Sequence, residues 1–332
     1  MEEKIIIKVS ELKKTFKVTK RAKGLPGTIA NLFVPKYTIK EAVNSISFEI
    51  KKGEAVGFVG MNGAGKSTTI KMLSGILYPD SGKVEILGYI PYKQRKQYVS
   101  RIGVVFGQKS QLSWDLPVID SFELLKRIYR IPEVKYKENL QRFKELLDMF
   151  SFIEQPVRQL SLGQRMRADI AAALLHSPEL VFFDEPTIGL DVLAKEKIRE
   201  FVRYINKEQQ VTMIFTTHDM KDIEQTCHRM ILIDAGRILY DGGVNEIIGK
   251  YGKERKLIVE FTENYKIEDI PDVVIEDKDE NKKIFSFNSG KVAMNKLMSY
   301  LSNTYNIKDF TVKEMEIDAI VRQIYEGGIK LR

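Results

Sequence analysis

The run GMNGAGKS at residues 60–67 carries the residue types that bind the phosphates of a nucleotide. It fits the pattern G-x-x-x-x-G-K-[ST], in which glycines let backbone N–H groups wrap around phosphate oxygens. The helix that follows would point its positive end at the same anion. Lys66 would reach the β- and γ-phosphates, and Ser67 would offer a hydroxyl to Mg²⁺. We therefore expect phosphate contacts from Gly60, Asn62, Gly63, Ala64, Gly65, Lys66, Ser67 and Thr68.

Two adjacent carboxylates follow the apolar run LVFF at residues 180–183. Asp184 would hold Mg²⁺ through water, and Glu185 could point at the γ-phosphate and polarise an attacking water. Acidic residues at the end of a strand are often simple capping groups. Their occurrence in a chain with a phosphate-binding loop favours the catalytic interpretation.

Two other polar residues also come directly after strand-like runs. Gln108 follows residues 102–106, where its side-chain carbonyl could ligate Mg²⁺. His218 follows residues 211–216 and is one of only three histidines. Taken alone, Gln108 would be interpreted as an ordinary polar loop residue, and His218 would be interpreted as a surface or core residue. Their interpretation as site residues depends on the other motifs.

A further motif, LSLGQ at residues 160–164, lies at the expected start of a helix. A hydroxyl, bare glycine amides and a helix dipole together accept an anion. In chain order, the motifs at 60–67, Gln108, 160–164, 180–185, Asp191 and His218 resemble those of the ATP-binding subunit of an ABC transporter. The resemblance covers residues 1 to about 250.

This resemblance implies an ATPase that uses ATP and Mg²⁺ and works as a head-to-tail homodimer with two ATP molecules at the interface. The catalytic residues that it implies are Lys66, Glu185 and His218. The metal ligands would be Ser67, Gln108 and Asp184. The second subunit would complete each site with Ser161, Gly163 and Gln164, while Asp191 braces the interface.

Two positions depart from the family's pattern. Leu162 stands where the family usually has the first glycine of LSGGQ, and residues 188–191 read IGLD in place of SALD. Because Ser161, Gly163, Gln164 and Asp191 remain, we expect activity to survive.

The adenine ring is usually stacked by an aromatic residue upstream of the phosphate loop. In this chain, about twenty residues separate the two parts of the family's pattern around this aromatic residue. Tyr37 matches the spacing to the later part, at Ala42, whereas Phe16 matches the earlier part. We prefer Tyr37 and keep Phe16 as the alternative. Simple core packing is the competing explanation for either residue.

The exporter branch is indicated by two further stretches. Residues 107–121 resemble type-2 exporters of the daunorubicin-resistance kind, and residues 19–35 resemble extensions in ATPases of polysaccharide exporters. The family's transmembrane permease subunit would contact the region from Gln108 to Ser121, around Trp114, although a buried structural tryptophan is equally consistent with the residue type.

The expected function is therefore an energy-coupling subunit of a membrane exporter, at the cytoplasmic face of the cell membrane. We expect no signal peptide and no membrane-spanning segment, so the transmembrane subunits would be separate chains. The alternative is a soluble, non-transport ABC ATPase that acts as a scaffold in cofactor assembly.

The expected fold class is α/β, a P-loop NTPase core in which strand-like and helical runs alternate. Residues 109–175 carry three helical runs without a strand, which predicts an inserted all-helical subdomain. A second domain of α+β type is expected over residues 251–332, after an ATPase domain over 1–250, with a charged loop at 276–283. Strands are expected at 256–261, 283–288 and 307–313, and helices at 291–303 and 317–325.

Charge is unevenly distributed along the chain. The formal net charge is +8, and residues 1–40 hold ten Lys or Arg against three Glu. Anionic lipid headgroups or a phosphorylated substrate could meet this stretch, but a solvated face is the simpler explanation. Nucleic acid is not expected as a partner, because no aromatic residues interleave the basic ones.

Overall fold

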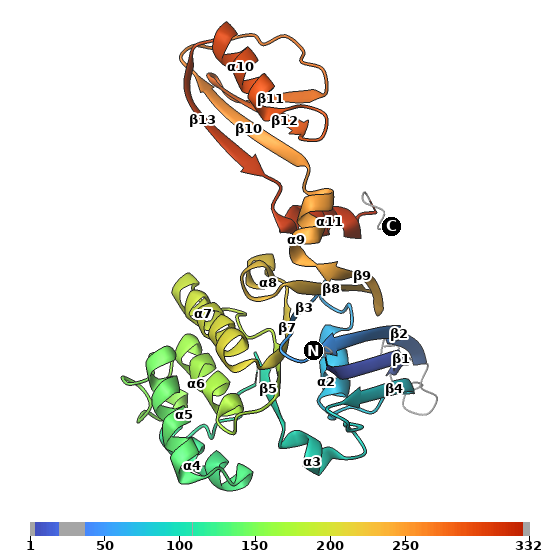
Figure 1. Ribbon diagram of the computed structural model, residues 1–332, viewed down its shortest axis with the longest axis vertical. Helices are drawn as coiled ribbons and strands as arrows, with labels where there is room; N and C mark the ends of the chain where they lie inside the picture. The colour runs from blue at the N-terminus through green and yellow to red at the C-terminus, as the bar shows by residue number, and fades with distance from the viewer. Residues whose placement is uncertain (1–3, 20–36, 108, 328–332) are drawn as a thin grey trace, which may run out of the picture. The chain divides into compact units, whose positions relative to one another are not determined.

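The computed structural model describes residues 4–19, 37–107 and 109–327, and it divides the chain into two compact units, Met1–Asp241 and Gly242–Arg332 (Figure 1). The predicted segment at 20–35 therefore lies outside the described residues. In the described part of the chain, no helix combines the length and apolar character that crossing a bilayer requires.

The first unit is built on a six-stranded sheet in the order β5-β6-β7-β3-β8-β9. The strands are β3 (Ala55–Gly60), β5 (Ile102–Phe106), β6 (Leu180–Asp184), β7 (Thr212–Thr217), β8 (Arg229–Asp234) and β9 (Arg237–Gly243). Strands β5, β6, β7, β3 and β8 pair in parallel, so the chain enters each of them from the same edge. Every residue of β3, β6 and β7 is buried, as expected for strands covered on both faces.

A three-stranded antiparallel sheet stands beside it, in the order β2-β1-β4. Its strands are β1 (Ile5–Thr19), β2 (Tyr37–Lys51) and β4 (Ser81–Ile86). Apolar residues of both sheets and of α2 (Lys66–Leu73) share one core, which includes Ile7, Phe48, Phe58, Ile70 and Phe182. This shared core fixes the phosphate loop between two rigid sheets.

The predicted helical insert is present. It consists of α4 (Val118–Tyr129), α5 (Glu133–Leu146), a short 3₁₀ turn (Val157–Gln159) and α6 (Leu162–Leu174). Figure 1 shows these helices grouped on one side of the unit, with α7 (Val192–Gln209) beside α6. The remaining helices of the unit are α3 (Arg95–Val99) and α8 (Met220–Thr226). The chain therefore has the α/β architecture that the sequence predicts.

The second unit is a four-stranded antiparallel sheet in the order β11-β12-β10-β13. Its elements are α9 (Val244–Tyr251), β10 (Glu254–Phe261), β11 (Val273–Asp279), β12 (Lys282–Asn288), α10 (Met294–Thr304), β13 (Ile307–Glu314) and α11 (Ile317–Tyr325). Residues of α10, Leu297 and Leu301, bury one face of the sheet against Leu257, Val259 and Phe285.

Two expectations for this end of the chain need correction. The predicted loop at 276–283 is largely strand, because β11 pairs with β12 and Ile275 faces the core, while the acidic residues that follow form an exposed edge. The division between units falls after Asp241, not after residue 250, because α9 belongs to the second unit, where it contacts α11.

Candidate nucleotide-binding site

The phosphate loop joins the buried strand β3 to helix α2, as the motif predicts. Gly63 and Gly65 have backbone φ angles of +85° and +111°, a region that residues with a Cβ rarely adopt. A Cβ on Gly65 would lie 2.3 Å from the carbonyl oxygen of Ala42. Both glycines are therefore required for the loop to curl around an anion at the start of α2.

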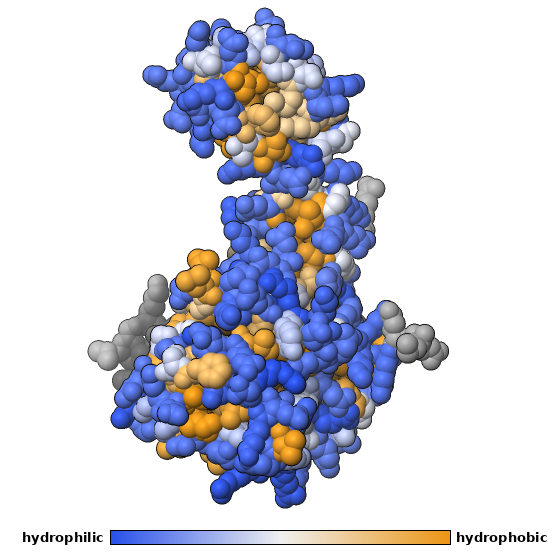
Figure 2. Space-filling model, turned by 60° about the vertical axis from the view of Figure 1, so that its left-hand side comes forward, coloured by the Kyte–Doolittle hydropathy of each residue, from blue (hydrophilic) through white to orange (hydrophobic). Residues whose placement is uncertain are grey.

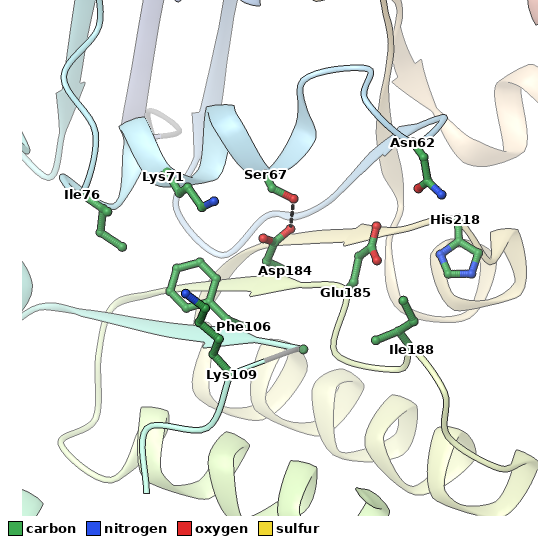
Figure 3. Close-up of a pocket in the computed structure, with 11 residues that line it drawn as sticks. Asn62, Ser67, Lys71, Ile76, Phe106, Lys109, Asp184, Glu185, Ile188 and His218 are labelled. Carbon is green, nitrogen blue, oxygen red and sulfur yellow. Dashed lines mark hydrogen bonds between the residues drawn. The ribbon is translucent and has the colours of Figure 1, made fainter. Parts of the chain in front are cut away.

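Two neighbouring cavities open beside this loop. The smaller has a volume of about 320 Å³ and is lined by Phe16, Lys40, Ala42, Asn62, Gly63, Gly65, Lys66, Ser67, Thr68 and Glu185. The larger, about 590 Å³, is lined by Asn62, Ser67, Lys71, Ile76, Phe106, Gly107, Lys109, Asp184, Glu185, Ile188 and His218 (Figure 3). Asn62, Ser67 and Glu185 line both cavities, so the predicted phosphate and catalytic residues share one region.

Two residues of the predicted phosphate loop, Gly60 and Ala64, pack against the sheet and the core and are not among the described residues that line either cavity. Ala64 is buried in the apolar core. Gly60 backs onto β8, where a Cβ would lie 2.6 Å from the carbonyl oxygen of Ile233. Their small size lets the loop lie against the sheet.

The Lys66 side chain is almost fully buried. Its ammonium donates to the carbonyl oxygens of Gly60 (2.6 Å) and Met61 (3.2 Å) and lies 3.8 Å from the nearer carboxylate oxygen of Glu185. Burial lowers the pKa of Lys66, and the negative charges of Glu185 and Asp184 oppose that change. The loop thus holds a cation in a largely dehydrated position, where its attraction to phosphate is strong.

Asp184 ends strand β6 and faces the phosphate loop. Its Oδ1 accepts hydrogen bonds from the hydroxyls of Ser67 (3.0 Å) and Thr216 (2.8 Å). Figure 3 shows Ser67 and Asp184 pointing toward each other across the cavity. The oxygen donors of Ser67 and Asp184 are the kind that Mg²⁺ prefers.

A protein-only cage for a metal is not found among the described residues, where no three acidic, histidine or cysteine side chains gather as a metal site. The predicted ligand Gln108 lies outside the described residues, while its neighbours Gly107 and Lys109 line the larger cavity.

Glu185 is held in an uncommon backbone conformation with φ of +53°. Its amide donates to the carbonyl oxygen (3.1 Å) and the hydroxyl (3.0 Å) of Thr216. A Cβ on Gly107 would lie only 2.0 Å from the Glu185 carbonyl oxygen, so Gly107 makes room for this turn. Strained residues of this kind cluster at functional sites, where the surrounding structure holds them.

His218 follows strand β7 and lines the larger cavity with Glu185. The residue before His218, Thr217, contacts the fully buried carboxylate of Asp222, on α8. Asp222 accepts hydrogen bonds from Thr187 (2.5 Å), Thr217 (2.9 Å) and Arg199 (2.6 Å). It therefore ties together the turn after Glu185, the residue before His218 and helix α7.

Sequence reasoning did not identify Thr216, Gly107 or Asp222. The signal for Thr216 is its pairing with Asp184 across two parallel strands, which the sequence does not display. Of the two candidate aromatic residues, Phe16 is among the described residues that line the smaller cavity, and Tyr37 is not. Tyr37 pairs with Thr19, three positions further along β1, whereas Phe16 pairs with Lys40 close to the loop.

The Ser161–Gln164 turn lies apart from both cavities, among whose described lining residues it does not occur. Ser161 caps helix α6: its hydroxyl accepts from the Gln164 amide (3.2 Å), and the Gln164 side chain accepts from the Ser161 amide (2.9 Å). This turn lies beside the start of α7, where Asp191 caps the helix by accepting from the Ala194 amide. A Cβ on Gly163 would lie 3.1 Å from the Cβ of Ala194.

The two departures from the expected motifs meet in space. A Cβ on Gly189 would lie 3.2 Å from Cδ2 of Leu162, and Gly189 has a positive φ of +72°. The absence of a side chain at 189 therefore leaves room for the leucine at 162.

Trp114 is exposed rather than buried, with 51% of its surface accessible, so a structural core role is excluded. The guanidinium of Arg165 lies 5.6 Å from its ring centroid. Leu116 beside it is also exposed.

Comparisons with known proteins identify relatives of this chain. A family model described as ABC transporter matches residues 43–188. The chain is 32% identical over 223 residues to the ABC transporter ATP-binding protein NatA of Bacillus subtilis (strain 168), which covers 67% of this chain and 89% of that protein. It is 31% identical over 220 residues to the daunorubicin resistance ATP-binding protein DrrA3 of Streptomyces coeruleorubidus, covering 66% and 69%.

A solved structure has the same fold. The dimeric ATP-binding cassette MJ0796 bound to ADP and Pi aligns with a TM-score of 0.59 and 25% identity, covering 72% of this chain and 99% of that one.

Proposed function

Because the chain belongs to the family of ABC transporter ATP-binding proteins, we propose that it hydrolyses ATP as a head-to-tail homodimer and drives a membrane exporter. The observation that carries this proposal is the division of the motifs within one chain. The phosphate loop, Asp184, Glu185 and His218 share one region, while the Ser161–Gln164 turn and Asp191 form another. A second copy would complete each site.

We assign the chemistry to residues of the first region. Lys66 and the loop amides bind the β- and γ-phosphates, and Phe16 stacks on the adenine ring. Ser67 and Asp184, with Gln108, would hold Mg²⁺, which would neutralise charge on the phosphates. Glu185 orients and polarises the attacking water, and His218 contacts the γ-phosphate from the end of β7. Thr216 positions the carboxylate of Asp184 and the backbone amide of Glu185 through the hydrogen bonds described above.

The surface around the second region supports self-association. Val192 and Leu193, which follow Asp191, are 79% and 83% exposed, and Leu162 is partly exposed beside them. Exposed apolar side chains at one place are typical of a protein interface. In the dimer, the hydroxyl of Ser161, the amide of Gly163 and the side chain of Gln164 would face the partner's γ-phosphate.

A separate apolar surface supports docking to transmembrane subunits. Trp114 and Leu116 are exposed, and so are Leu124 and Ile128 of α4. Figure 2 shows apolar residues scattered in patches over the ATPase unit. We propose that the region from Gln108 to Ser121 contacts the permease at the cytoplasmic face of the membrane. Export is favoured because the relative DrrA3 is named for drug resistance.

The proposal is tested with Glu185→Gln, which keeps the shape of the side chain but removes its charge. ATP binding should persist while steady-state phosphate release falls by about 10²- to 10⁴-fold, since a general base is lost. ATP should then stay trapped in the closed dimer, which co-elution of labelled ATP with the protein on gel filtration would detect. Glu179→Gln, on the exposed segment before β6, is the matched control. Phosphate release near the wild-type rate from Glu185→Gln would overturn the assignment.

A further inference from the structure

The C-terminal unit presents an exposed strand edge. Strand β13 ends the sheet, bonded to β10 on one side, and no strand in the described part of the chain pairs with its other side. All its residues except Ile307 are exposed. Such an edge is a template for pairing with another strand unless charge or a bulge protects it.

Two apolar side chains of β13 lie on the face of the sheet that forms the core. Phe310 pairs with Val259 and Val312 with Leu257, so they share the face of these core residues. Yet Phe310 is 50% exposed and Val312 is 40% exposed. Apolar residues are visible on the C-terminal unit in Figure 2, which is turned to bring the side of β13 forward. The core of the unit is thus open at this edge.

From these features we propose that β13 pairs with β13 of a second copy, antiparallel and centred on Thr311, to form a continuous eight-stranded sheet. In this register Phe310 faces Val312 of the partner subunit. Asp309 faces the partner's Lys313. Lys308 is the extra residue of a bulge opposite β10 and bonds to Glu260, so the regular pairing would run from Asp309 to Lys313. If the pairing were centred on Phe310 instead, Lys308 would lie opposite Val312. If it were centred on Val312, Phe310 would lie opposite Glu314. The strand is therefore self-complementary in one register.

Charges within the unit favour the same arrangement. On β10, the residue opposite Asp309 is Glu260, and the residue opposite Lys313 is Lys256. Like charges that face each other across a sheet are destabilising. Glu260 is already paired with Lys308 and Lys282 inside the unit, so the contact that a carboxylate from a second copy would offset is that of Lys313 with Lys256.

The other edge of the sheet offers a contrast. Strand β11 carries Glu276, Asp277 and Asp279 within four positions. Pairing of β11 with a copy of itself would gather these carboxylates, so this edge is protected by charge. The open edge at β13 is the one suited to self-association.

This contact is independent of nucleotide, and it goes beyond the proposed ATP-dependent dimer. Because both units belong to one chain, it would keep two ATPase units at a high effective concentration after each hydrolysis step.

The test is sedimentation velocity of the full chain without nucleotide over a concentration series. Wild type should be dimeric. Asp309→Lys and Lys313→Glu should each weaken the dimer about tenfold, because each opposes like charges twice per interface. Neither change should unfold the unit, because each one replaces a pair of like charges across β10 and β13 by a pair of opposite charges.

The charge swap provides the decisive controls. The double variant Asp309→Lys/Lys313→Glu should recover the wild-type dimer, and an equimolar mixture of the two single variants should form heterodimers. A monomeric wild type, single variants that dimerise as well as wild type, or a double variant as weak as the singles would each overturn the proposal. ATP hydrolysis measured on the same samples reports separately on the nucleotide site.

Discussion

The two regions that carry the nucleotide motifs are built differently. Around Asp184, the polar groups are buried and bonded to one another, through Ser67, Thr216 and the amide of Glu185. At the start of α6, the side chains of Ser161 and Gln164 accept hydrogen bonds from each other's backbone amides near the surface. Such capping bonds contribute about 1 kcal/mol. A partner's phosphate could therefore replace them at little cost, whereas the buried region is fixed before any partner arrives.

The largest effect is expected from breaking the buried region at Asp222→Asn. This change removes the fully buried carboxylate that Arg199 contacts most closely, leaving only its longer contacts with Glu196 (3.4 Å) and Asp219 (3.6 Å). It should lower the free energy of unfolding by about 3 kcal/mol. Urea unfolding of the full chain measures the loss. Asp219→Asn is the control at the same arginine, because the partly exposed Asp219 bonds to Lys195 (2.7 Å) and lies 3.6 Å from Arg199, and its loss should cost about 1 kcal/mol at most. Equal losses in the two variants would contradict the role of Asp222.

A pH-dependent effect is expected at the far end of α6, where His176 anchors the helix that Ser161 caps. Its ring stacks on Tyr129, its Nε2 contacts the Ile102 carbonyl oxygen, and burial lowers the pKa of His176 to about 4. The unfolded chain therefore binds the proton first, and stability is lost as the pH falls below the unfolded value of about 6.5.

Comparing wild type with His176→Phe isolates this contribution. From pH 7 to pH 5 the wild type should lose about 2 kcal/mol of unfolding free energy more than the variant. Asp169 acts in the opposite direction, because burial raises its pKa to about 6, so its stability penalty is relieved on acidification. That contribution is common to both proteins. Parallel pH profiles for the two would refute the assignment to His176.

A third prediction concerns which aromatic residue contacts the adenine ring in the region around the phosphate loop. Phe16→Ala should weaken ATP binding by about 1–3 kcal/mol, the usual contribution of stacking between an aromatic side chain and a base. Tyr37→Ala should leave the affinity unchanged. Equilibrium binding of a fluorescent ATP analogue measures both variants. A larger loss for Tyr37→Ala would restore the interpretation that spacing alone favours.

The smallest effect on turnover is expected from Gly189→Ala, beside the Ser161–Gln164 turn that we propose faces the partner. The added Cβ would meet Leu162 in a backbone conformation that alanine disfavours, so we expect a strain of about 1 kcal/mol and a corresponding fall in turnover. Leu162→Gly in the same chain should relieve the contact and recover part of the rate at saturating ATP. Additive losses in the double variant would show that the two positions are not coupled.

The sequence predicted those features that depend on local spacing. The phosphate loop is one, because glycines, Lys66 and the start of α2 are consecutive in the chain. Thr216 and Gly107 were missed because their contacts with Asp184 and Glu185 depend on which strands are neighbours. Phe16 was ranked second because the register between β1 and β2 decides which aromatic residue reaches the loop. Strand β11 was missed because acidic residues on its free edge resemble a loop.

The central claim is that each catalytic site takes residues from two chains. Lys66→Ala disables the phosphate loop, whereas Ser161→Asp keeps a residue suited to capping α6 but places a negative charge where the partner's γ-phosphate would lie. Each variant alone should be inactive. Mixed in equal amounts, they should regain ATPase activity, because one site of each mixed dimer combines two intact halves. A mixture that stays as inactive as its components, or an active Ser161→Asp chain, would contradict the account.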